Sequence, residues 1–438
     1  VLLPLLAQFA KDVNFERIIV VPLTGKPVPQ GYEDYEGFIG GATDDFKCVE
    51  VDENAPCGMC YTSGTTGSPK GVVYSHRSTV LHTLVAALPG GINVSGTDTV
   101  LPVVPMFHAN AWGLPFVSTF VGAKQVFPGP HLDSESLLDL YQRERVTVTG
   151  GVPTIWLSLL QTLRANPGKY DLVPGMRMMV GGSAAPESLF RGFDEFGLEV
   201  GTAWGMTETS PLGTVSSLKP SMRALPKEEQ YAFRIKQGMA APLVEIRLVG
   251  DNGEVPWDGR SVGEIQVRGP WITGSYHDLP INESSFTADG WLRTGDVGCI
   301  DSEGFLQLTD RTKDLIKSGG EWISSVDLEN AVMGHPAVLE ASVIAVPHPR
   351  WAERPLAVVV IGGRQLGLAI LMHDAAHRAQ QLLVECWRAV SHPDGHHDEC
   401  DQPSKPRLNT GAFEQPNKQQ LMTRQALQTK PWGVKRQR

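Results

Sequence analysis

Residues 61–71 read YTSGTTGSPKG, and this stretch says more about the fold of the chain than any other. Its three threonines, one serine and two glycines between Thr62 and Gly67 cannot bury apolar surface. They can turn backbone N–H groups and hydroxyls toward one anion, because glycine tolerates positive φ and close approach. The apolar residues 57–61 and 71–74 on either side predict two β-strands. The stretch therefore predicts a strand–loop–strand cradle for a polyphosphate.

The loop differs from a Walker P-loop, in which a Ser or Thr directly follows the lysine. Here Gly71 follows Lys70. The alternative interpretation is a flexible connector rich in Gly, Ser and Thr. It is disfavoured because predicted strands bracket the loop, which is rare for linkers.

Four motifs in order resemble the adenylate-forming superfamily, which contains acyl-CoA synthetases, luciferases and the adenylation domains of peptide synthetases. The first is the loop at 61–71 and the second is Trp204-Gly205-Met206-Thr207-Glu208. The third and fourth are residues 291–296, WLRTGD, and 310–322, DRTKDLIKSGGEW. The resemblance extends from about Leu2 to Val360 and is closest to the fatty-acyl-CoA synthetase branch. It implies that a carboxylic acid reacts with ATP to an acyl-adenylate and pyrophosphate, and that CoA then displaces AMP.

The resemblance also implies the nucleotide site, with ATP, Mg²⁺ and CoA as cofactors. Trp204 would stack on adenine, Thr207 would contact the α-phosphate, and Glu208 would bind Mg²⁺ together with Thr62. One carboxylate is chemically sufficient, since Mg²⁺ favours one or two carboxylates plus phosphate oxygens. Asp296 would accept both ribose hydroxyls, because a carboxylate offers two acceptor oxygens. The residues implied around the β- and γ-phosphates are Thr62, Ser63, Gly64, Thr65, Thr66, Gly67 and Lys70.

The fourth motif resembles the hinge before the small C-terminal domain. Arg311 matches a ribose and phosphate contact, and Lys313 matches the hinge between an adenylating and a thioester-forming position. Lys317 and Trp322 match residues that line the adenylate in the fatty-acyl branch. Without the resemblance, the charged run at 310–314 predicts only an exposed turn.

Residues 104–112, VPMFHANAW, resemble the stretch behind the acyl site. Phe107 and His108 would flank the carboxylate, and Trp112 matches the gate of the fatty-acid tunnel; a lone His is otherwise more often a packed core residue. Gly182 belongs to residues 180–186, VGGSAAP, which resemble the wall between the adenine and acyl pockets. These small residues leave volume for an alkyl chain and offer no acidic group for an amino acid, which disfavours a peptide-synthetase module. The length of the acyl chain stays open: the candidates are long-chain acids, medium-chain acids, and short thioether acids such as methylmercaptopropionate.

The pattern of apolar residues predicts an α/β fold with stacked layers. Residues 17–21 and 146–149 read as buried strands, and residues 134–143 and 154–163 as helices. From about residue 241 the texture changes: period-two alternation at 244–249 and 263–268 predicts antiparallel strands, and residues 301–304 predict a hairpin turn. We therefore expect four ranges: an α/β core at 1–240 that lacks the first part of the family domain, a β-rich subdomain at 241–310, the hinge and start of a partly present C-terminal α/β domain at 311–360, and a disordered tail at 361–438.

Composition narrows the functional classes. The net charge of -10 over 438 residues argues against nucleic-acid or anionic-membrane binding, and no apolar run is long enough to span a bilayer. Six cysteines without paired spacing indicate a reducing compartment, so we expect a cytoplasmic protein whose partners are its small-molecule substrates, and a homodimer stays open.

The match to the family stops abruptly after Val360. No Pro-x-x-x-x-Gly-Lys loop, whose lysine contacts the reacting carboxylate and α-phosphate in the family, follows. Frameshifted or mis-spliced translation explains this loss of pattern and predicts disorder. A zinc site from Cys386, His392, His396 and Cys400 is a disfavoured alternative. The second functional hypothesis is therefore a catalytically dead remnant that binds nucleotide only.

Overall fold

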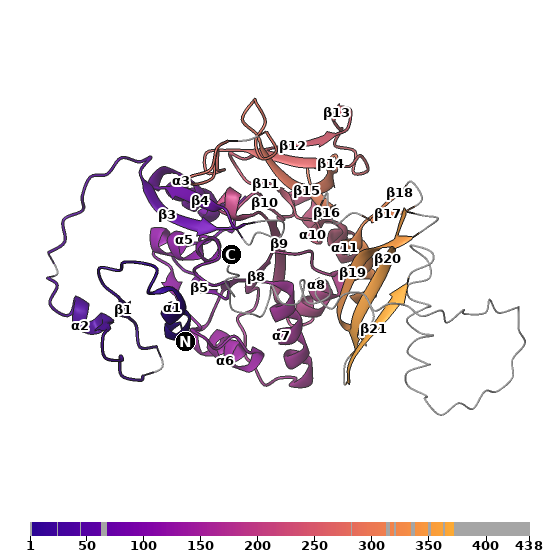
Figure 1. Cartoon of the computed structure of the whole chain (residues 1–438). Coiled ribbons are helices and arrows are strands. Elements are labelled where there is room, and N and C mark those ends of the chain that lie inside the picture. The colour runs from indigo at the N-terminus through magenta and orange to yellow at the C-terminus, as the bar shows by residue number, and fades with distance from the viewer. Residues whose placement is uncertain are drawn as a thin grey trace, which may run out of the picture. The chain divides into compact units, whose positions relative to one another are not determined.

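A seven-stranded sheet forms the middle layer of residues 99–240 in a computed structural model of the chain (Figure 1). Its strands lie in the order β11-β10-β9-β8-β7-β5-β6, with β5 to β9 parallel and β10 and β11 added antiparallel. Their bounds are β5 (Thr99–Pro102), β6 (Lys124–Gln125), β7 (Val148–Gly151), β8 (Arg177–Val180), β9 (Glu199–Trp204), β10 (Thr214–Val215) and β11 (Met239–Ala240).

The structure describes residues 2–23, 25–43, 45–62, 68–281, 283–311, 316–318, 321–333, 338–348, 352–361 and 364–371. All of them belong to one unit, Val1–Val384.

Helices cover both faces of the seven-stranded sheet. Successive side chains of a strand point to opposite faces, so each strand presents apolar side chains to helices on both sides. α3 (His76–Ala87) and α5 (Leu114–Val121) pack on the face that carries Val100 and Met179. α6 (Ser134–Glu144), α7 (Pro153–Ala165) and α8 (Glu187–Asp194) pack on the face that carries Leu101 and Val180. The predicted helices at 134–143 and 154–163 and the buried strand at 146–149 are confirmed. Among the described helices, none has both the length and the apolar character needed to cross a bilayer.

Local sequence signals mark where these helices begin. The Ser75 hydroxyl accepts a hydrogen bond from the Ser78 N–H and the Ser78 hydroxyl accepts one from the Ser75 N–H, both at 3.0 Å, which forms a capping box before α3. Asp133 caps α6 by accepting from the Ser136 N–H at 2.9 Å. α7 begins with Pro153. Proline has no backbone N–H, and in the first turn of a helix such an N–H would have no partner within the helix.

A second, five-stranded sheet is antiparallel and has the strand order β13-β12-β14-β15-β16. Its strands are β12 (Glu245–Gly250), β13 (Gly253–Glu254), β14 (Gly263–Arg268), β15 (Leu292–Ile300) and β16 (Leu306–Arg311). The predicted antiparallel strands and the hairpin turn at 301–304 are confirmed. The Asp301 carboxylate closes that turn by accepting from the N–H groups of Glu303 and Phe305, each at 2.9 Å.

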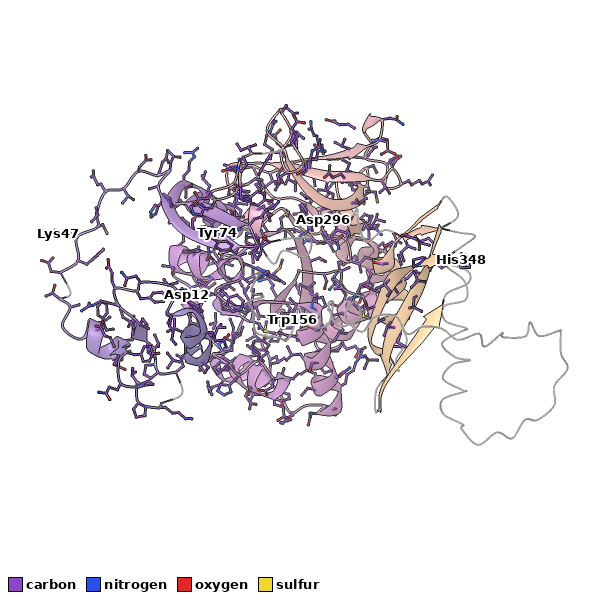
Figure 2. The ribbon with its side chains drawn as sticks, viewed as in Figure 1. Asp12, Lys47, Tyr74, Trp156, Asp296 and His348 are labelled. Carbon is purple, nitrogen blue, oxygen red and sulfur yellow. The ribbon has the colours of Figure 1, made fainter. Side chains whose placement is uncertain are left out.

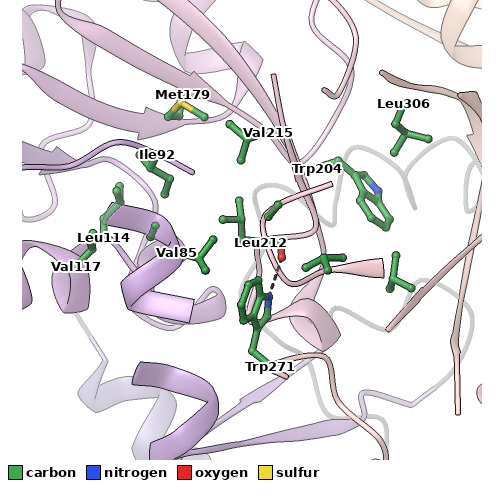
Figure 3. Close-up of a cluster of buried hydrophobic side chains, with 14 of the residues drawn as sticks. Val85, Ile92, Leu114, Val117, Met179, Trp204, Leu212, Val215, Trp271 and Leu306 are labelled. Atoms are coloured by element: carbon green, nitrogen blue, oxygen red, sulfur yellow. Dashed lines mark hydrogen bonds between the residues drawn. The ribbon is translucent and has the colours of Figure 1, made fainter. Parts of the chain in front are cut away.

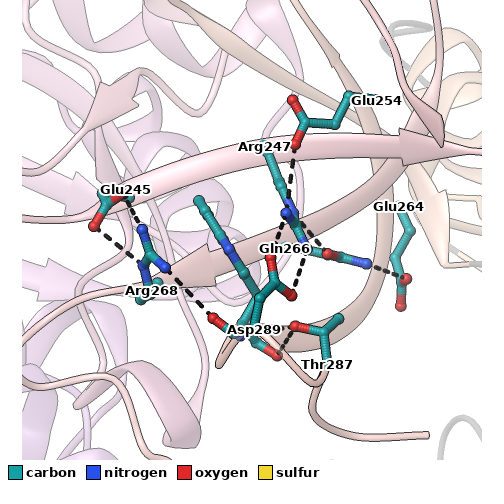
Figure 4. Close-up of polar contacts among 9 residues, drawn as sticks. Glu245, Arg247, Glu254, Glu264, Gln266, Arg268, Thr287 and Asp289 are labelled. Carbon is teal, nitrogen blue, oxygen red and sulfur yellow. Dashed lines mark hydrogen bonds and ion pairs between the residues drawn. The ribbon is translucent and has the colours of Figure 1, made fainter. Parts of the chain in front are cut away.

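Ion pairs cover the outer side of this antiparallel sheet (Figure 4). The guanidinium groups of Arg247 and Arg268 lie 4.4 and 4.6 Å from the ring centre of Trp291. Arg247 also pairs with Asp289 at 2.9 Å, and Arg268 pairs with Glu245 at 2.6 Å. The stems and charges of the two arginines therefore shield the tryptophan that begins the third motif.

One hydrophobic core joins the two sheets (Figure 3). Val100 and Met179 of the first sheet and Leu248 of the second belong to the same cluster of buried side chains. At its centre Trp271 is 2% exposed, and its Nε1 donates to the Leu212 carbonyl at 2.9 Å. Leaving that buried N–H unpaired would cost about 1–3 kcal/mol. The two sheets are therefore held together by a shared core in which the Trp271 N–H is satisfied.

The loop at residues 62–70 lies between β3 (Pro56–Tyr61) and β4 (Gly71–Ser75), which pair antiparallel. The Lys70 carbonyl accepts from the Thr62 N–H at 2.9 Å, and the Thr62 hydroxyl accepts from the Lys70 N–H at 3.0 Å. These two bonds close the neck of the loop, while residues 63–67 lie outside the described residues. Both predicted strands are confirmed.

A third sheet corrects the expectation of a disordered tail from residue 361. It contains β17 (Ile316–Ser318), β18 (Glu321–Ile323), β19 (Val338–His348), β20 (Ala352–Ile361) and β21 (Arg364–Leu371), and α11 (Ser325–Met333) packs on β19. β21 pairs antiparallel with β20. The physical reason is that Leu366, Leu368 and Ile370 alternate with period two, which favours a strand. Residues 372–438, with the zinc candidates, lie outside the described residues.

Residues 2–51 contain α1 (Leu3–Phe9), β1 (Ile19–Val20), β2 (Glu33–Asp34) and α2 (Tyr35–Ile39), and none of their described side chains is buried. The prediction of a buried strand at 17–21 is wrong. Ile19 and Val21 are 37% and 52% exposed, because the two-residue pair of β1 with β2 is too small to bury them. The remaining described helices are α4 (Ala109–Trp112), α9 (Pro220–Arg223) and α10 (Lys227–Arg234).

His82 of α3 gives the stability of this fold a pH dependence. Its side chain is 2% exposed, and its Nε2 has no hydrogen-bond partner within the described part of the chain. Burial lowers the pKa of His82 from 6.5 to about 4. The unfolded chain therefore takes up this proton at a higher pH than the folded chain does. The folded state loses stability as the pH falls from 6.5 to about 4, by ~3 kcal/mol in total.

We expect His82→Leu to remove this dependence, since leucine takes up no proton. Urea denaturation at pH 5 and pH 7 should show a smaller loss of unfolding free energy in the variant than in the wild type. His131→Leu, at an exposed position, is the matched control and should keep the wild-type loss. A His82→Leu variant that loses as much stability as the wild type would contradict the assignment.

Candidate functional site

A cavity of about 830 Å³ lies at the carboxyl ends of β8 and β9, the edge at which parallel sheets usually bind ligands. It is lined from the β3–β4 loop, the segment after β5, the ends of β8 and β9, and β15. The predicted site residues on its wall are Thr62, Lys70, His108, Trp112, Gly182, Trp204, Thr207, Glu208 and Asp296. The fold therefore brings residues of all three N-terminal motifs to one place.

Trp204, the last residue of β9, is held by Asp296 of β15. The indole Nε1 donates to the Asp296 Oδ2 at 2.9 Å, and the Trp204 side chain is 5% exposed. The Asp296 N–H donates to the Thr294 hydroxyl at 3.1 Å, which fixes the strand beneath the carboxylate. An aromatic ring and a carboxylate in fixed positions fit an aromatic base and a diol.

Glu208 is a carboxylate buried in the wall of the cavity. It lies in the 3₁₀ turn Thr207–Thr209 and is 5% exposed. Burial raises its pKa, although a hydrogen bond from the Tyr276 hydroxyl to Oε1 at 2.7 Å and the charge of Lys70 act in the opposite direction. A buried carboxylate that its neighbours compensate only in part favours a cation beside it.

Two tyrosines that the sequence analysis missed support this wall. Besides bonding Glu208, the Tyr276 ring lies 4.5 Å from the Lys70 Nζ. Tyr74 lies on β4 (Figure 2), and its hydroxyl donates to the Thr207 carbonyl at 2.8 Å. Tyr276 stands in a stretch without periodicity, so nothing local marks it. Tyr74 follows the loop at 62–70, but a tyrosine on a strand is usually interpreted as a core residue.

Another part of the cavity wall is apolar: Ile92, Leu114, Met179 and Leu212, which belong to one hydrophobic cluster, line the cavity, and so does Trp112. Trp112 closes α4, whose four residues have φ between +42° and +58°. This is a left-handed turn, in which each L-residue is strained by about 1–2 kcal/mol. Such backbone persists only where its surroundings hold it, and it is frequent at functional sites.

His108 precedes this turn and lines the cavity, and partial burial lowers its pKa. The expectation that Phe107 also flanks a carboxylate is corrected: its side chain is 83% exposed and is not among the residues on the cavity wall. The reason is that Phe107 lies in a turn, which the His108 N–H closes by donating to the Pro105 carbonyl at 3.0 Å, and the ring of Phe107 points out of this turn into solvent.

Some predicted residues are not placed as side chains. Residues 63–67 and Lys313 lie outside the described residues. Of Arg311, Lys317 and Trp322 the structure describes only the backbone: Arg311 pairs with Asp296 across β15 and β16, and Lys317 pairs with Trp322 across β17 and β18. Their roles stay predictions.

Among the described residues, no three His, Cys, Asp or Glu side chains gather closely enough to hold a metal ion by themselves. The predicted Mg²⁺ ligands, Glu208 and Thr62, both reach the cavity. Mg²⁺ usually takes one or two protein oxygens and completes its shell with water and phosphate oxygens. These two residues therefore fit that ion together with a phosphate-bearing ligand.

Comparison with protein families gives two matches in this chain. The AMP-binding enzyme family matches residues 10–277, and the AMP-binding enzyme C-terminal domain matches residues 327–390. The second match continues beyond Val360, at which we placed the end of the resemblance.

Individual relatives and solved structures agree with these matches. A long-chain-fatty-acid–CoA ligase of Thermus thermophilus is 50% identical over 366 residues, which are 83% of this chain and 66% of the relative. A 3-methylmercaptopropionyl-CoA ligase of Ruegeria pomeroyi is 46% identical over 333 residues, 76% of this chain and 61% of the relative. The o-succinylbenzoate CoA synthetase of Bacillus subtilis, solved with its acyl-adenylate intermediate, matches with a TM-score of 0.64 and 30% identity, over 82% of this chain and 68% of that one. The α/β fold is confirmed. The chain spans at most 66% of the length of these two curated relatives.

We expect Glu208→Gln to stabilise the folded chain at neutral pH. The folded-state pKa of Glu208 lies above its ordinary 4.5, so wild-type stability falls as the pH rises from 4.5 through the folded-state pKa. A neutral amide removes this loss and keeps an acceptor for Tyr276. Unfolding free energies from urea denaturation should show an advantage of the variant that grows from pH 5 to pH 8. Glu228→Gln, whose carboxylate pairs with Arg191 at the surface, should gain nothing. An advantage of Glu208→Gln that does not grow with pH would contradict the raised pKa.

Proposed function

Since the chain belongs to the AMP-binding enzyme family, we propose that it joins a carboxylic acid to coenzyme A with ATP. The acid carboxylate attacks the α-phosphorus and releases pyrophosphate, which leaves an acyl-adenylate. The CoA thiolate then attacks the acyl carbon and releases AMP. One observation carries the proposal: a single cavity joins a polar wall with Trp204, Glu208 and Asp296 to an apolar wall with Leu114 and Met179.

The polar end would hold the nucleotide. Trp204 offers an aromatic face to adenine, and Asp296 accepts from the ribose hydroxyls. Thr207 contacts the α-phosphate, and Thr62 to Gly67 with Lys70 contact the other two phosphates. Gly182, with φ +83°, provides close backbone approach beside the base. Mg²⁺ held by Glu208 and Thr62 would neutralise charge that develops on the phosphates.

The apolar end would hold the acid. His108 lines the same cavity, and its lowered pKa favours a neutral imidazole beside the carboxylate. Trp112 would act as the gate to the alkyl chain. The acid is a fatty acid in this proposal, and the relative named for methylmercaptopropionate supports a short thioether acid as the alternative.

The C-terminal part would supply the second half-reaction. Arg311, Lys317 and Trp322 would face the adenylate, and Lys313 would be the hinge.

We propose the domain boundaries given above, 1–240, 241–310 and 311–360, on the same grounds. We also propose a cytoplasmic location and a monomer or homodimer. Among the described residues Cys48, Cys57, Cys60 and Cys299 are free thiols, which a reducing compartment preserves.

A second candidate function, nucleotide binding without turnover, rests on one sequence feature. Residues 361–438 contain no Pro-x-x-x-x-Gly-Lys loop. Loss of one preorganised charge contact lowers the rate on the order of 100- to 1,000-fold. The chain would then bind ATP or an acyl-adenylate without forming detectable product.

The test is acyl-CoA formation from ATP, CoA and acids of four to sixteen carbons, repeated with premade acyl-adenylates and CoA. We expect product from the premade adenylates in the wild type. Glu208→Gln should lower the ATP-dependent rate on the order of 100- to 1,000-fold and affect the adenylate reaction less, because Mg²⁺ acts on the phosphates. Asp289→Asn, at a position 59% exposed on the outer side of the antiparallel sheet, is the control and should change neither rate.

The outcomes separate the two functions. Product from neither series, with a rise in Tm on addition of ATP, would support nucleotide binding without turnover. Product from neither series and no change in Tm would contradict both functions.

A further inference from the structure

Trp112 lies against two glycines on neighbouring parallel strands. Gly150 belongs to β7, and Gly181 directly follows β8. A Cβ added to Gly181 would lie 3.1 Å from the Trp112 Cη2. A Cβ added to Gly150 would lie 3.1 Å from the Leu114 Cδ1 and 3.4 Å from the Trp112 Cε3. Carbon atoms in contact are normally about 3.5–4.0 Å apart. The indole therefore occupies the space that a side chain at Gly181 would need, and at Gly150 Leu114 and the indole occupy it together.

The backbone does not require glycine at either position. Neither Gly150 nor Gly181 has a φ in the left-handed region, whereas the next residue, Gly182, has φ +83°. Any L-residue can adopt the backbone of Gly150 and Gly181. What distinguishes them is the missing side chain, whose place is taken by Trp112 at Gly181 and by Leu114 together with Trp112 at Gly150.

The turn that carries Trp112 is anchored on both sides. The Asn110 Oδ1 accepts from the Cys60 Sγ of β3 at 3.6 Å. Gly113, which ends the turn with φ +72°, lies so near His82 of α3 that an added Cβ would be 2.6 Å from the ring Cε1. Because these contacts hold the left-handed backbone, the indole can change position chiefly by rotation about its own side-chain bonds.

The indole forms part of the cavity wall. Trp112, Leu114 and Gly181 are among the residues that line the cavity, and Gly150 is not. A group added at Gly150 would meet Leu114 first and then the indole. Both side chains would be pressed toward the space that the alkyl chain occupies in the proposed function.

We propose that Gly150 and Gly181 determine the acyl chain length by providing a seat for the Trp112 indole. The inference rests on the proposed function. With glycine at both positions the indole lies back against the strands and the apolar end accepts a long chain. A side chain at Gly181 displaces the indole, and one at Gly150 displaces Leu114 together with the indole. The cavity narrows in both cases, and long acids lose affinity before short ones do.

Non-hydrolysable acyl-sulfamoyl-adenosines with six and sixteen carbons test the proposal by titration calorimetry. In Gly150→Ala and Gly181→Ala we expect the sixteen-carbon analogue to lose at least about tenfold more affinity than the six-carbon analogue, on the scale of steric discrimination in pockets. Gly58→Ala on β3 is the matched control, since nothing lies within 4 Å of its added Cβ. Its ratio of the two affinities should equal that of the wild type.

Double variants with Trp112→Ala isolate the contact itself. Without the indole, Gly150→Ala and Gly181→Ala should each change the affinity ratio less. Both should also lower the Tm in the presence of Trp112 and lower it less in its absence. Part of each effect persists, because an added Cβ would also lie 3.1 Å from the Leu114 Cδ1 at Gly150 and 3.1 Å from the Ala203 carbonyl oxygen at Gly181.

Each result decides the inference. An unchanged affinity ratio in both glycine variants overturns it, while binding of the analogues by the wild type still supports the proposed function. A shift that persists unchanged in the Trp112→Ala background also overturns it. A wild type that binds neither analogue overturns the proposed function, and with it the role of the glycines in chain length. The Tm values of the single and double variants then measure only the packing of the indole against the glycines.

Discussion

The hydrogen bond from the Trp204 Nε1 to the Asp296 Oδ2 is the contact on which the site depends. It spans 92 residues and 2.9 Å, and it joins the end of a parallel strand to an antiparallel strand. The shared core around Trp271 holds the two sheets at the distance that this bond needs. Because each sheet supplies only part of the wall, the cavity exists only when both have folded and packed.

Several residues around the cavity have charges or backbone conformations that lower the stability of the folded chain. Glu208 is a carboxylate whose burial disfavours its charged form, and α4 is a turn of left-handed backbone. Elsewhere the chain follows ordinary rules, with capped helices, a closed hairpin and paired surface charges. Local departures of this kind are expected at functional sites, where the surrounding structure compensates for them. The contrast supports the view that the cavity, rather than the outer face of the antiparallel sheet, carries the function.

Much of this could be predicted from the sequence wherever a local pattern determines the structure. The strands around the phosphate loop, α6, α7 and the hairpin at 301–304 all follow from periodicity or turn chemistry. Tyr276 could not be predicted, because its partner Glu208 is 68 residues away and its surroundings carry no pattern. The left-handed turn was equally hidden, since Ala109 and Ala111 are residues that favour ordinary helix. The apolar run at 17–21 misled because burial depends on neighbours that a local pattern does not reveal.

The central claim is that the wall formed by Trp204 and Asp296 holds the nucleotide. Equilibrium binding of AMP to the wild type and to Asp296→Asn tests it most directly. Asparagine keeps one acceptor for Trp204 and replaces the second carboxylate oxygen with a donor, which a ribose diol cannot satisfy. The account predicts that AMP binds the wild type and that the variant, folded with a similar Tm, binds about tenfold or more weakly. Equal AMP affinity in the two proteins, or no binding to the wild type, would contradict it.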